Sequence, residues 1–310
     1  MNAASLPTTR LPTSIPEYLE QLRAALAGAD QALVQDALYD AEEYLRSELA
    51  ENAGRNEAEV IALVASSYGA PDEVADIYRD TEVKVQTALR APPPRPRESA
   101  LGRFFGVVAD PRTYASMFYM VLALATGIFY FTWVVTGVSM SFGLAVLVIG
   151  IPFVILYFGS VRVLSLVEGR IVEVMLGERM PRRPLYSERG KPLLERIKDM
   201  FTDPRTWSTQ LYFLLMLPLG IIYFTLTVTL LSVSLASIAS PLLAWFGTTD
   251  GGLWVDNIQV ASQRNWWWEL PLLFVAGCVL LFATLHLVRG VGRLHGQFAK
   301  NLLVKAAQYS

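Results

Sequence analysis

The chain has 310 residues, of which 53% are hydrophobic and 17% are charged, and this balance excludes a wholly soluble protein. The formal net charge of −2 conceals an asymmetry, because residues 1–90 hold 16 acidic and 7 basic residues whereas residues 91–310 hold 12 and 19. One cysteine excludes an intramolecular disulfide, and with two histidines a His/Cys zinc site is a poor expectation, so we expect neither a metal nor a cofactor.

Residues 15–90 are predicted to form an acidic soluble module of four short helices, after a disordered start at 1–14. Apolar residues recur there at spacings of three and four, which is typical of amphipathic helices. Gly54 and the sequence Gly-Ala-Pro-Asp at 69–72 interrupt this pattern. The acidic excess indicates a solvated face and argues against direct binding of nucleic acid, because phosphates attract basic residues. Residues 91–103, rich in Pro and Arg, are predicted to be a semi-rigid linker.

Three long runs without any charged residue predict the membrane spans. They cover 113–161, 206–249 and 270–288, which are 49, 44 and 19 residues long. A helix needs about 20 apolar residues to cross the hydrocarbon core, so the first run has room for two spans and a turn near 137–141. The apolar segment 233–246 is short for a crossing, and we expect it to be interfacial or re-entrant rather than a fifth span, with an extension of the third span left open. The four spans are predicted near 114–137, 141–163, 207–231 and 268–289.

The Lys and Arg residues set the orientation of these spans. Nine of them lie between the second and third spans and four follow the fourth, whereas the predicted outer connections contain only Arg264. Because positively charged flanks stay in the cytoplasm, both termini are predicted to be cytoplasmic. We expect a multi-pass protein of the bacterial cytoplasmic membrane, with the insertion 233–267 on its outer side.

An internal repeat organises the membrane part. The sequence Asp-Pro-Arg-Thr at 110–113 recurs at 203–206, an offset of 93 residues. Two spans per repeat make the repeats parallel, so we predict an all-α, polytopic four-helix bundle of two tandem repeats, 104–199 and 200–310, with a pseudo-twofold axis along the membrane normal. Other matched positions are Tyr119 with Tyr212, Tyr130 with Tyr223 and, at an offset of 127 after the fourth span, Arg162 with Arg289, Gly169 with Gly296 and Glu168 with His295.

The repeated residues have structural and functional interpretations. Asp110 and Asp203 are expected to cap the helices that follow them. The repeated tyrosines either bond across helices or line a pocket for a ligand or signal. In the outer insertion, Trp254 and Asp256 are candidates for recognition, with packing as the alternative, whereas the tryptophans at 266–268 fit an aromatic belt. The candidate tyrosines are Tyr119, Tyr130, Tyr212 and Tyr223.

The basic connection that follows the second span is expected to couple the two repeats, and its charge, opposite to that of the acidic module, makes docking of the module on it a further hypothesis. In this connection, residues 193–201 interleave apolar and basic side chains, as an interfacial helix does. Reversing charges in the connection should therefore release the module. The candidate docking residues are Asp40, Glu43, Asp72 and Glu73 in the module and Arg182, Arg183, Lys191 and Lys198 in the connection.

The sequence offers little catalytic chemistry. It contains no Gly-x-Ser-x-Gly, no His-Glu-x-x-His and no phosphate-binding loop. Asp40 and Glu43 lie one helical turn apart, a spacing that is ordinary for solvated surface carboxylates. His286, near the end of the fourth span, is either hydrogen-bonded or a pH switch. We therefore expect a protein that is not an enzyme.

Two family resemblances rest on these motifs. The sequences Tyr-Leu-x-x-Leu at 18–22, Asp-Ala-Glu-Glu-Tyr-Leu at 40–45 and Tyr-Gly-Ala-Pro-Asp-Glu-Val-Ala at 68–75 resemble the bacterial HAAS module, a small helical domain often encoded beside PadR-type transcription regulators. Residues 104–303 resemble the bacterial "putative sensor" membrane domain, through the tandem Asp-Pro-Arg-Thr and the sequences Gly-Arg-Ile and Gly-Gln-Phe after the second and fourth spans.

These resemblances imply a sensor or adaptor that relays an envelope signal through its helical module to a regulator. The expected partners are the lipid bilayer and a PadR-type regulator or another cytoplasmic signalling protein, and a homo-oligomer is left open. The alternative is an auxiliary or permease subunit of a transporter, which predicts a polar path through the bundle. The scarcity of charged residues within the spans weighs against a transporter.

Overall fold

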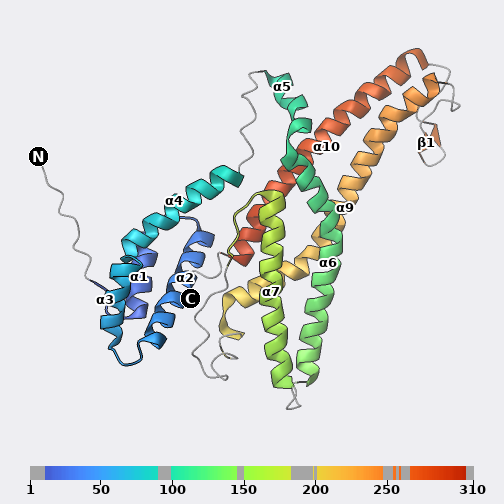
Figure 1. Ribbon diagram of the computed structural model, residues 1–310. Helices are drawn as coiled ribbons and strands as arrows, with labels where there is room; N and C mark the ends of the chain where they lie inside the picture. The colour runs from blue at the N-terminus through green and yellow to red at the C-terminus, as the bar shows by residue number, and fades with distance from the viewer. Residues whose placement is uncertain are drawn as a thin grey trace, which may run out of the picture. The chain divides into compact units, whose positions relative to one another are not determined.

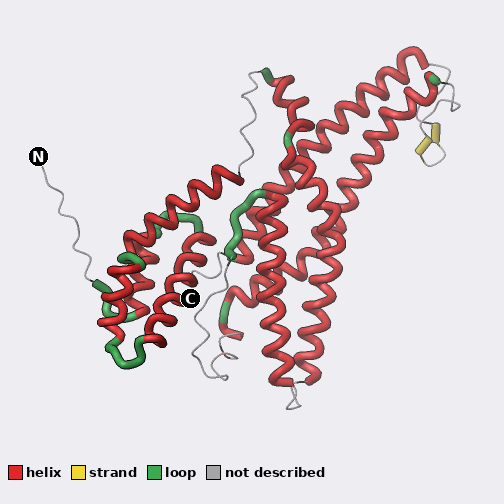
Figure 2. Tube along the Cα trace, in the orientation of Figure 1, coloured by secondary structure: helices red, strands yellow, loops and turns green. Residues whose placement is uncertain are grey.

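The computed structural model is almost entirely helical in the part of the chain that it describes (Figures 1 and 2). The chain divides into two compact units, one formed by Met1–Pro93 with Arg179–Thr202 and the other by Pro94–Glu178 with Asp203–Ser310. The predicted repeat at 104–199 is thus split, with its last residues in the N-terminal unit. The described residues are 11–89, 99–144, 150–182, 198, 201–246, 254–255, 258–259 and 266–304.

The N-terminal unit contains four helices around an apolar core. Tyr18, Leu22 and Leu45 are among its fully buried side chains, and the Tyr18 hydroxyl donates a hydrogen bond of 2.8 Å to the carbonyl of Gly69. Two helices begin at residues whose side chains accept backbone N–H bonds, as N-caps do. The helices are α1 (Ile15–Ala25), α2 (Gln31–Glu51), α3 (Glu57–Ser67) and α4 (Pro71–Leu89).

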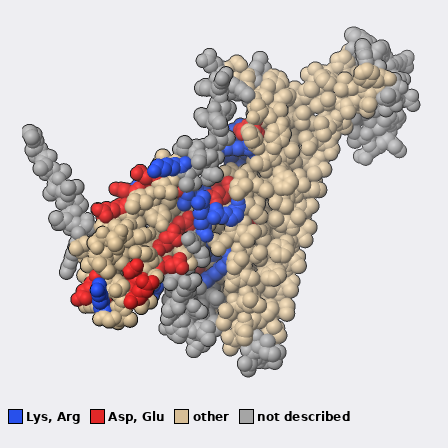
Figure 3. Space-filling model, in the orientation of Figure 1, with Lys and Arg blue, Asp and Glu red and all other residues tan. Residues whose placement is uncertain are grey.

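The second unit holds four helices that are long and apolar enough to cross a membrane. Many of their large apolar side chains, such as Ile128, Ile221 and Val275, are exposed, and the visible faces of these helices carry almost no charge (Figure 3). Such a surface is stable in lipid rather than in water. The four helices are α6 (Pro111–Leu144), α7 (Gly150–Leu176), α9 (Pro204–Trp245) and α10 (Trp266–Leu303), preceded by α5 (Ala100–Phe105) and the 3₁₀ turn η1 (Gly106–Ala109).

Two local predictions were wrong. The turn expected near 137–141 lies inside α6, where a Cβ atom on Gly137 would overlap the ring of Tyr157; this glycine serves close packing instead of chain reversal. The segment 233–246 was expected to be interfacial or re-entrant, with an extension of the third span left open, and it continues α9 as far as Trp245. Helix continuation satisfies the backbone groups of this apolar segment within the chain itself, and Pro241 is accommodated within the helix.

A close crossing joins α6 and α9 at two glycines. A Cβ atom on Gly127 would lie 2.5 Å from the carbonyl oxygen of Met216, and a Cβ atom on Gly220 would overlap the carbonyl of Ala123. Only glycine allows two helix backbones to approach in this way. All four long helices pack on one another around this crossing, and beyond it the pair α6–α7 diverges from the pair α9–α10 (Figure 1).

Between α9 and α10, within residues 247–265, the structure describes only β1 (Trp254–Val255) and β2 (Ile258–Gln259), which pair as antiparallel strands. Trp254 lies opposite Gln259 in this pairing. Asp256 lies outside the described residues, as does the environment of the Trp254 side chain. The recognition role of these two residues stays a prediction.

Candidate functional site: a buried polar centre

Glu168 of α7 is fully buried inside the membrane unit and accepts three hydrogen bonds from tyrosine hydroxyls. Tyr119 and Tyr212 donate to its Oε1 over 2.8 and 2.9 Å. Tyr130 donates to Oε2 over 2.9 Å. Three donors fall within the acceptor capacity of a carboxylate, which has about four lone-pair sites, and such charge-assisted bonds are the strong ones in proteins.

His295 of α10 completes the cluster from the opposite side. Its Nε2 lies 2.7 Å from the hydroxyl of Tyr119 and 3.1 Å from that of Tyr212, and its Nδ1 lies 3.2 Å from the hydroxyl of Tyr223. Because Tyr119 and Tyr212 donate their single protons to Glu168, their oxygens can only accept from His295, so Nε2 carries a proton. Nδ1 then accepts from Tyr223 in a neutral imidazole or donates to it in an imidazolium.

The cluster, which we call the polar centre, draws on all four long helices at matching depths. Tyr119 and Tyr212 lie eight residues after the starts of α6 and α9, and Glu168 and His295 lie eight residues before the ends of α7 and α10. Eight residues of α-helix correspond to about 12 Å. A buried ionisable group at such a depth is costly unless it is paired, and it marks a functional site by default.

Aromatic rings fix the polar centre in place. Tyr130 stacks on Phe213 with ring centroids 4.4 Å apart, and Phe298 contacts both Tyr212 and His295. Among the described residues, the void beside Tyr223 has a volume of only about 10 Å³, too small for a ligand. In this conformation the four repeated tyrosines therefore act as hydrogen-bonding partners between helices.

Two ion pairs link the helix pairs crosswise. Asp110, before α6, pairs with Arg289 of α10 at 2.7 Å, and Asp203, before α9, pairs with Arg162 of α7 at 3.9 Å. Each aspartate also accepts a backbone N–H bond from the residue two positions later, at 3.0 and 2.9 Å, which is the geometry of a helix cap. Asp110 and Asp203 thus each cap a helix of one pair and form an ion pair with an arginine of the other pair.

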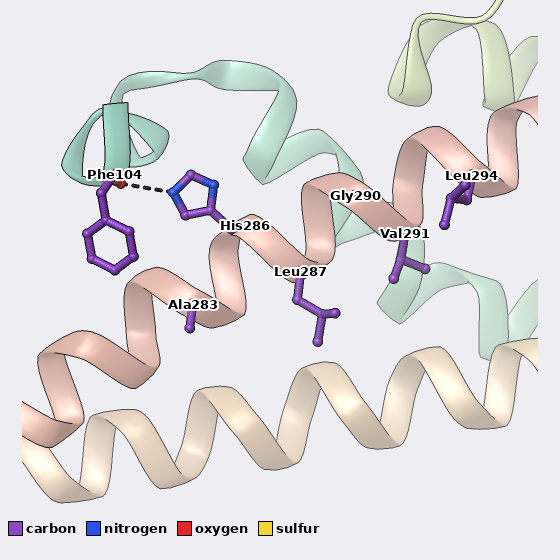
Figure 4. Close-up of a pocket in the computed structure, with 7 residues that line it drawn as sticks. All are labelled: Phe104, Ala283, His286, Leu287, Gly290, Val291 and Leu294. Carbon is purple, nitrogen blue, oxygen red and sulfur yellow. Dashed lines mark hydrogen bonds between the residues drawn. The ribbon is translucent and has the colours of Figure 1, made fainter. Parts of the chain in front are cut away.

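His286 lies elsewhere on α10, beside an apolar groove of about 750 Å³. Its Nε2 lies 3.0 Å from the carbonyl oxygen of Phe104, and the two rings stack (Figure 4). A carbonyl only accepts, so Nε2 carries a proton. His286 thus ties α5 to α10. The described groove lining is Phe104, Ala283, His286, Leu287, Gly290, Val291 and Leu294.

The predicted docking residues are spread over the N-terminal unit. The Asp40 carboxylate accepts a hydrogen bond of 3.0 Å from Tyr78, Glu43 is half-buried and Asp72 is exposed. Glu73 accepts from the backbone N–H of Ala70. In the connection, Arg182 and Lys198 are exposed, whereas Arg183 and Lys191 lie outside the described residues.

Arg179 makes a contact that the sequence did not single out. Its guanidinium pairs with Asp36 of α2 and Glu82 of α4, and the exposed fractions of the three side chains are 13, 8 and 10%. Asp36 falls beside Leu33 and Ala37 on the buried face of α2. A carboxylate on an apolar stripe requires a partner, so the three- and four-residue spacing of the apolar residues could have indicated Asp36 but not the arginine that pairs with it.

Glu168 and His295 were also absent from the predicted site. Their match in the repeat register was the available signal, but Glu168 lies beyond the predicted end of the second span at 163, whereas α7 continues to Leu176. A charged residue that seemed to flank the membrane is in fact inside the helix packing.

Together these features define a polytopic α-helical membrane protein whose helices meet at a buried polar centre. The family model described as "Putative sensor" matches residues 119–303, and the chain belongs to this family. All six residues of the polar centre lie within the match. A comparison with curated proteins found no match, and neither did a comparison with solved structures. The matched range does not include the N-terminal module, whose resemblance to HAAS stays a prediction.

Proposed function

We propose that the protein is a non-enzymatic membrane sensor or adaptor, in which the polar centre registers the relative position of two helix pairs. Membership of the sensor family supports the class. The observation that carries the proposal is the hydrogen-bonded set of Glu168, His295 and the tyrosines, which joins all four long helices at one depth. The two helix pairs are proposed to be tandem repeats, and the crosswise ion pairs support this origin.

A cluster of this kind favours discrete states over gradual deformation. Hydrogen bonds to a carboxylate in a low-dielectric interior are strong when made and costly when broken. A shift of one helix pair against the other must therefore exchange one complete set of bonds for another. Such bistability is what allows a small displacement to be passed on as a signal.

The output is proposed to pass through the acidic N-terminal module. With both termini in the cytoplasm of a bacterial cell, the module would face cytoplasmic proteins, and its resemblance to HAAS makes a PadR-type transcription regulator the expected partner. The lipid bilayer is the other expected partner. A homo-oligomer is compatible with this scheme.

The test is affinity capture from crosslinked cells. We would compare the full chain, a form without residues 1–90, and the variants Glu168→Gln and Tyr157→Phe in the full chain. Tyr157→Phe is the matched control, because its buried hydroxyl has no hydrogen-bond partner among the described residues. We expect a regulator to be recovered with the full chain and Tyr157→Phe, in an altered amount with Glu168→Gln, and not with the truncated form.

Two results would count against the proposal. Recovery of transporter subunits with both the full and truncated forms would favour the transporter alternative. Equal recovery of the regulator with Glu168→Gln and Tyr157→Phe would show that the polar centre does not affect binding of the regulator.

A further inference from the structure

The chain that follows α7 places an arginine on two carboxylates of the N-terminal module. Gly177 ends the helix with a φ of +77°, a left-handed conformation that glycine adopts without strain. Two residues later the Arg179 guanidinium contacts Glu82, and its Nη2 lies 3.3 Å from Oδ2 of Asp36. The backbone N–H of Arg182 donates to Oδ1 of the same aspartate over 2.7 Å.

The two carboxylates form a built site for a guanidinium group. They come from different helices, α2 and α4, and are about nine-tenths buried. A guanidinium presents a planar set of donors that can bond two carboxylates at once, which a lysine ammonium does less well. Two acidic side chains held this close together inside a module that is already acidic repel each other unless a cation lies between them.

We propose that Asp36 and Glu82 form an arginine-recognition site on the N-terminal module, filled in cis by Arg179 and open to an arginine of a cytoplasmic partner once the segment 179–182 leaves. This inference rests on the proposed function, because it states how the module would be switched. The partner is defined by its chemistry, as a protein that presents an exposed arginine in an extended segment.

Chain connectivity links this site to the polar centre. Arg179 follows Glu168 by 11 residues, and the last helical residue between them is Leu176. A shift of α7 that breaks the bonds of Glu168 therefore acts directly on the segment that carries Arg179. The cis arginine holds the site closed to other arginines only while this segment stays docked.

The experiment uses the full chain in lipid nanodiscs and a fluorescent peptide of residues 176–182, Leu-Gly-Glu-Arg-Met-Pro-Arg. The variant Arg179→Ala vacates the site. Arg182→Ala is its matched control, because Arg182 contributes its backbone N–H and keeps that bond. We expect the peptide to bind Arg179→Ala at least about tenfold more tightly than the wild type or Arg182→Ala, since the site has lost its occupant. Adding Glu82→Gln to Arg179→Ala should abolish this gain.

Hydrogen exchange on the same samples provides a second readout. Arg179→Ala should raise exchange in α2 and α4 by about tenfold or more, because removing one partner of a buried ion pair is strongly destabilising, and the peptide should reverse this rise. If Arg179→Ala does not fold, Arg179→Lys replaces it, with weaker docking expected from the lost planar geometry. Equal peptide binding by all variants, or exchange unchanged relative to Arg182→Ala, would overturn the inference. Neither readout needs a regulator, so this site can fail while the proposed function stands.

Discussion

Removing single hydroxyl groups from buried tyrosines provides a graded test of the polar centre. In Tyr130→Phe, Oε2 of Glu168 loses the one tyrosine donor that the described residues supply to it. A hydrogen bond to a charged group contributes about 1.5 to 3 kcal/mol, and we expect a loss of that size in the free energy of unfolding. Tyr157→Phe removes an equally buried hydroxyl that has no partner among the described residues, so we expect a change near zero or a slight gain.

The other two donors should behave differently, because they are redundant. Tyr119 and Tyr212 both bridge Oε1 of Glu168 and Nε2 of His295. Each single Phe variant leaves one bridge in place, whereas the double variant leaves neither. The double loss should therefore exceed the sum of the single losses by about 1 to 2 kcal/mol, within the range seen for residues in one network.

The assay is equilibrium unfolding of the purified full chain in mixed detergent micelles, followed by far-ultraviolet circular dichroism. The ranking matters more than any single value. If Tyr157→Phe costs as much as Tyr130→Phe, or if Tyr119→Phe and Tyr212→Phe are additive, the bonding scheme derived for the polar centre is wrong.

Three further predictions concern other parts of the structure. Gly127→Ala should cost about 1 to 3 kcal/mol through overpacking against α9, whereas Gly143→Ala, which meets no atom within 4 Å, should have little effect in the same unfolding assay. Asp110→Arg should lower the free energy of unfolding of the second unit, because it breaks the ion pair with Arg289. Adding Arg289→Asp should restore part of that loss if the 2.7 Å pair is a direct one. Burial raises the pKa of Tyr18 above its ordinary value of 10.0, so the unfolded module releases this proton first. The contribution of Tyr18 to the stability of the module should therefore be constant below about pH 10 and fall at higher pH, and Tyr18→Phe should remove this part of the fall in hydrogen-exchange measurements.

The sequence predicted the membrane helices better than the contacts between them. Charge-free runs locate spans because a bilayer excludes charge over about 30 Å, but they do not locate helix ends. Arg162 ends the first charge-free run, so the second span was predicted to end at 163 and Glu168 was placed outside it, although α7 continues to Leu176. The length criterion also misjudged 233–246, since an apolar segment can prolong a helix instead of forming a separate element.

The repeat register indicated which residues correspond, but not that they touch. It matched Tyr119 with Tyr212 and Glu168 with His295, and the structure brings all four into one cluster. Correspondence becomes contact only through the close approach of α6 and α9, which depends on their three-dimensional packing. Arg179 shows the same limit, because nothing in the sequence separates it from the other basic residues of its connection.

Because α6 and α9 are in close contact at their crossing, a tilt of α6 about this point moves its two ends in opposite directions. On α6, Gly127 lies eight residues from Tyr119 and 17 residues from Leu144, so the arms on the two sides of this fulcrum measure about 12 and 26 Å. A sideways movement of about 2 Å at the far end thus displaces Tyr119 by about 1 Å in the opposite direction. Where this displacement runs along the bond between Tyr119 and Glu168, it lengthens the 2.8 Å contact beyond hydrogen-bond range. A disturbance in that direction no larger than the width of one methyl group, applied at the far end of α6, is therefore enough to separate Glu168 from Tyr119.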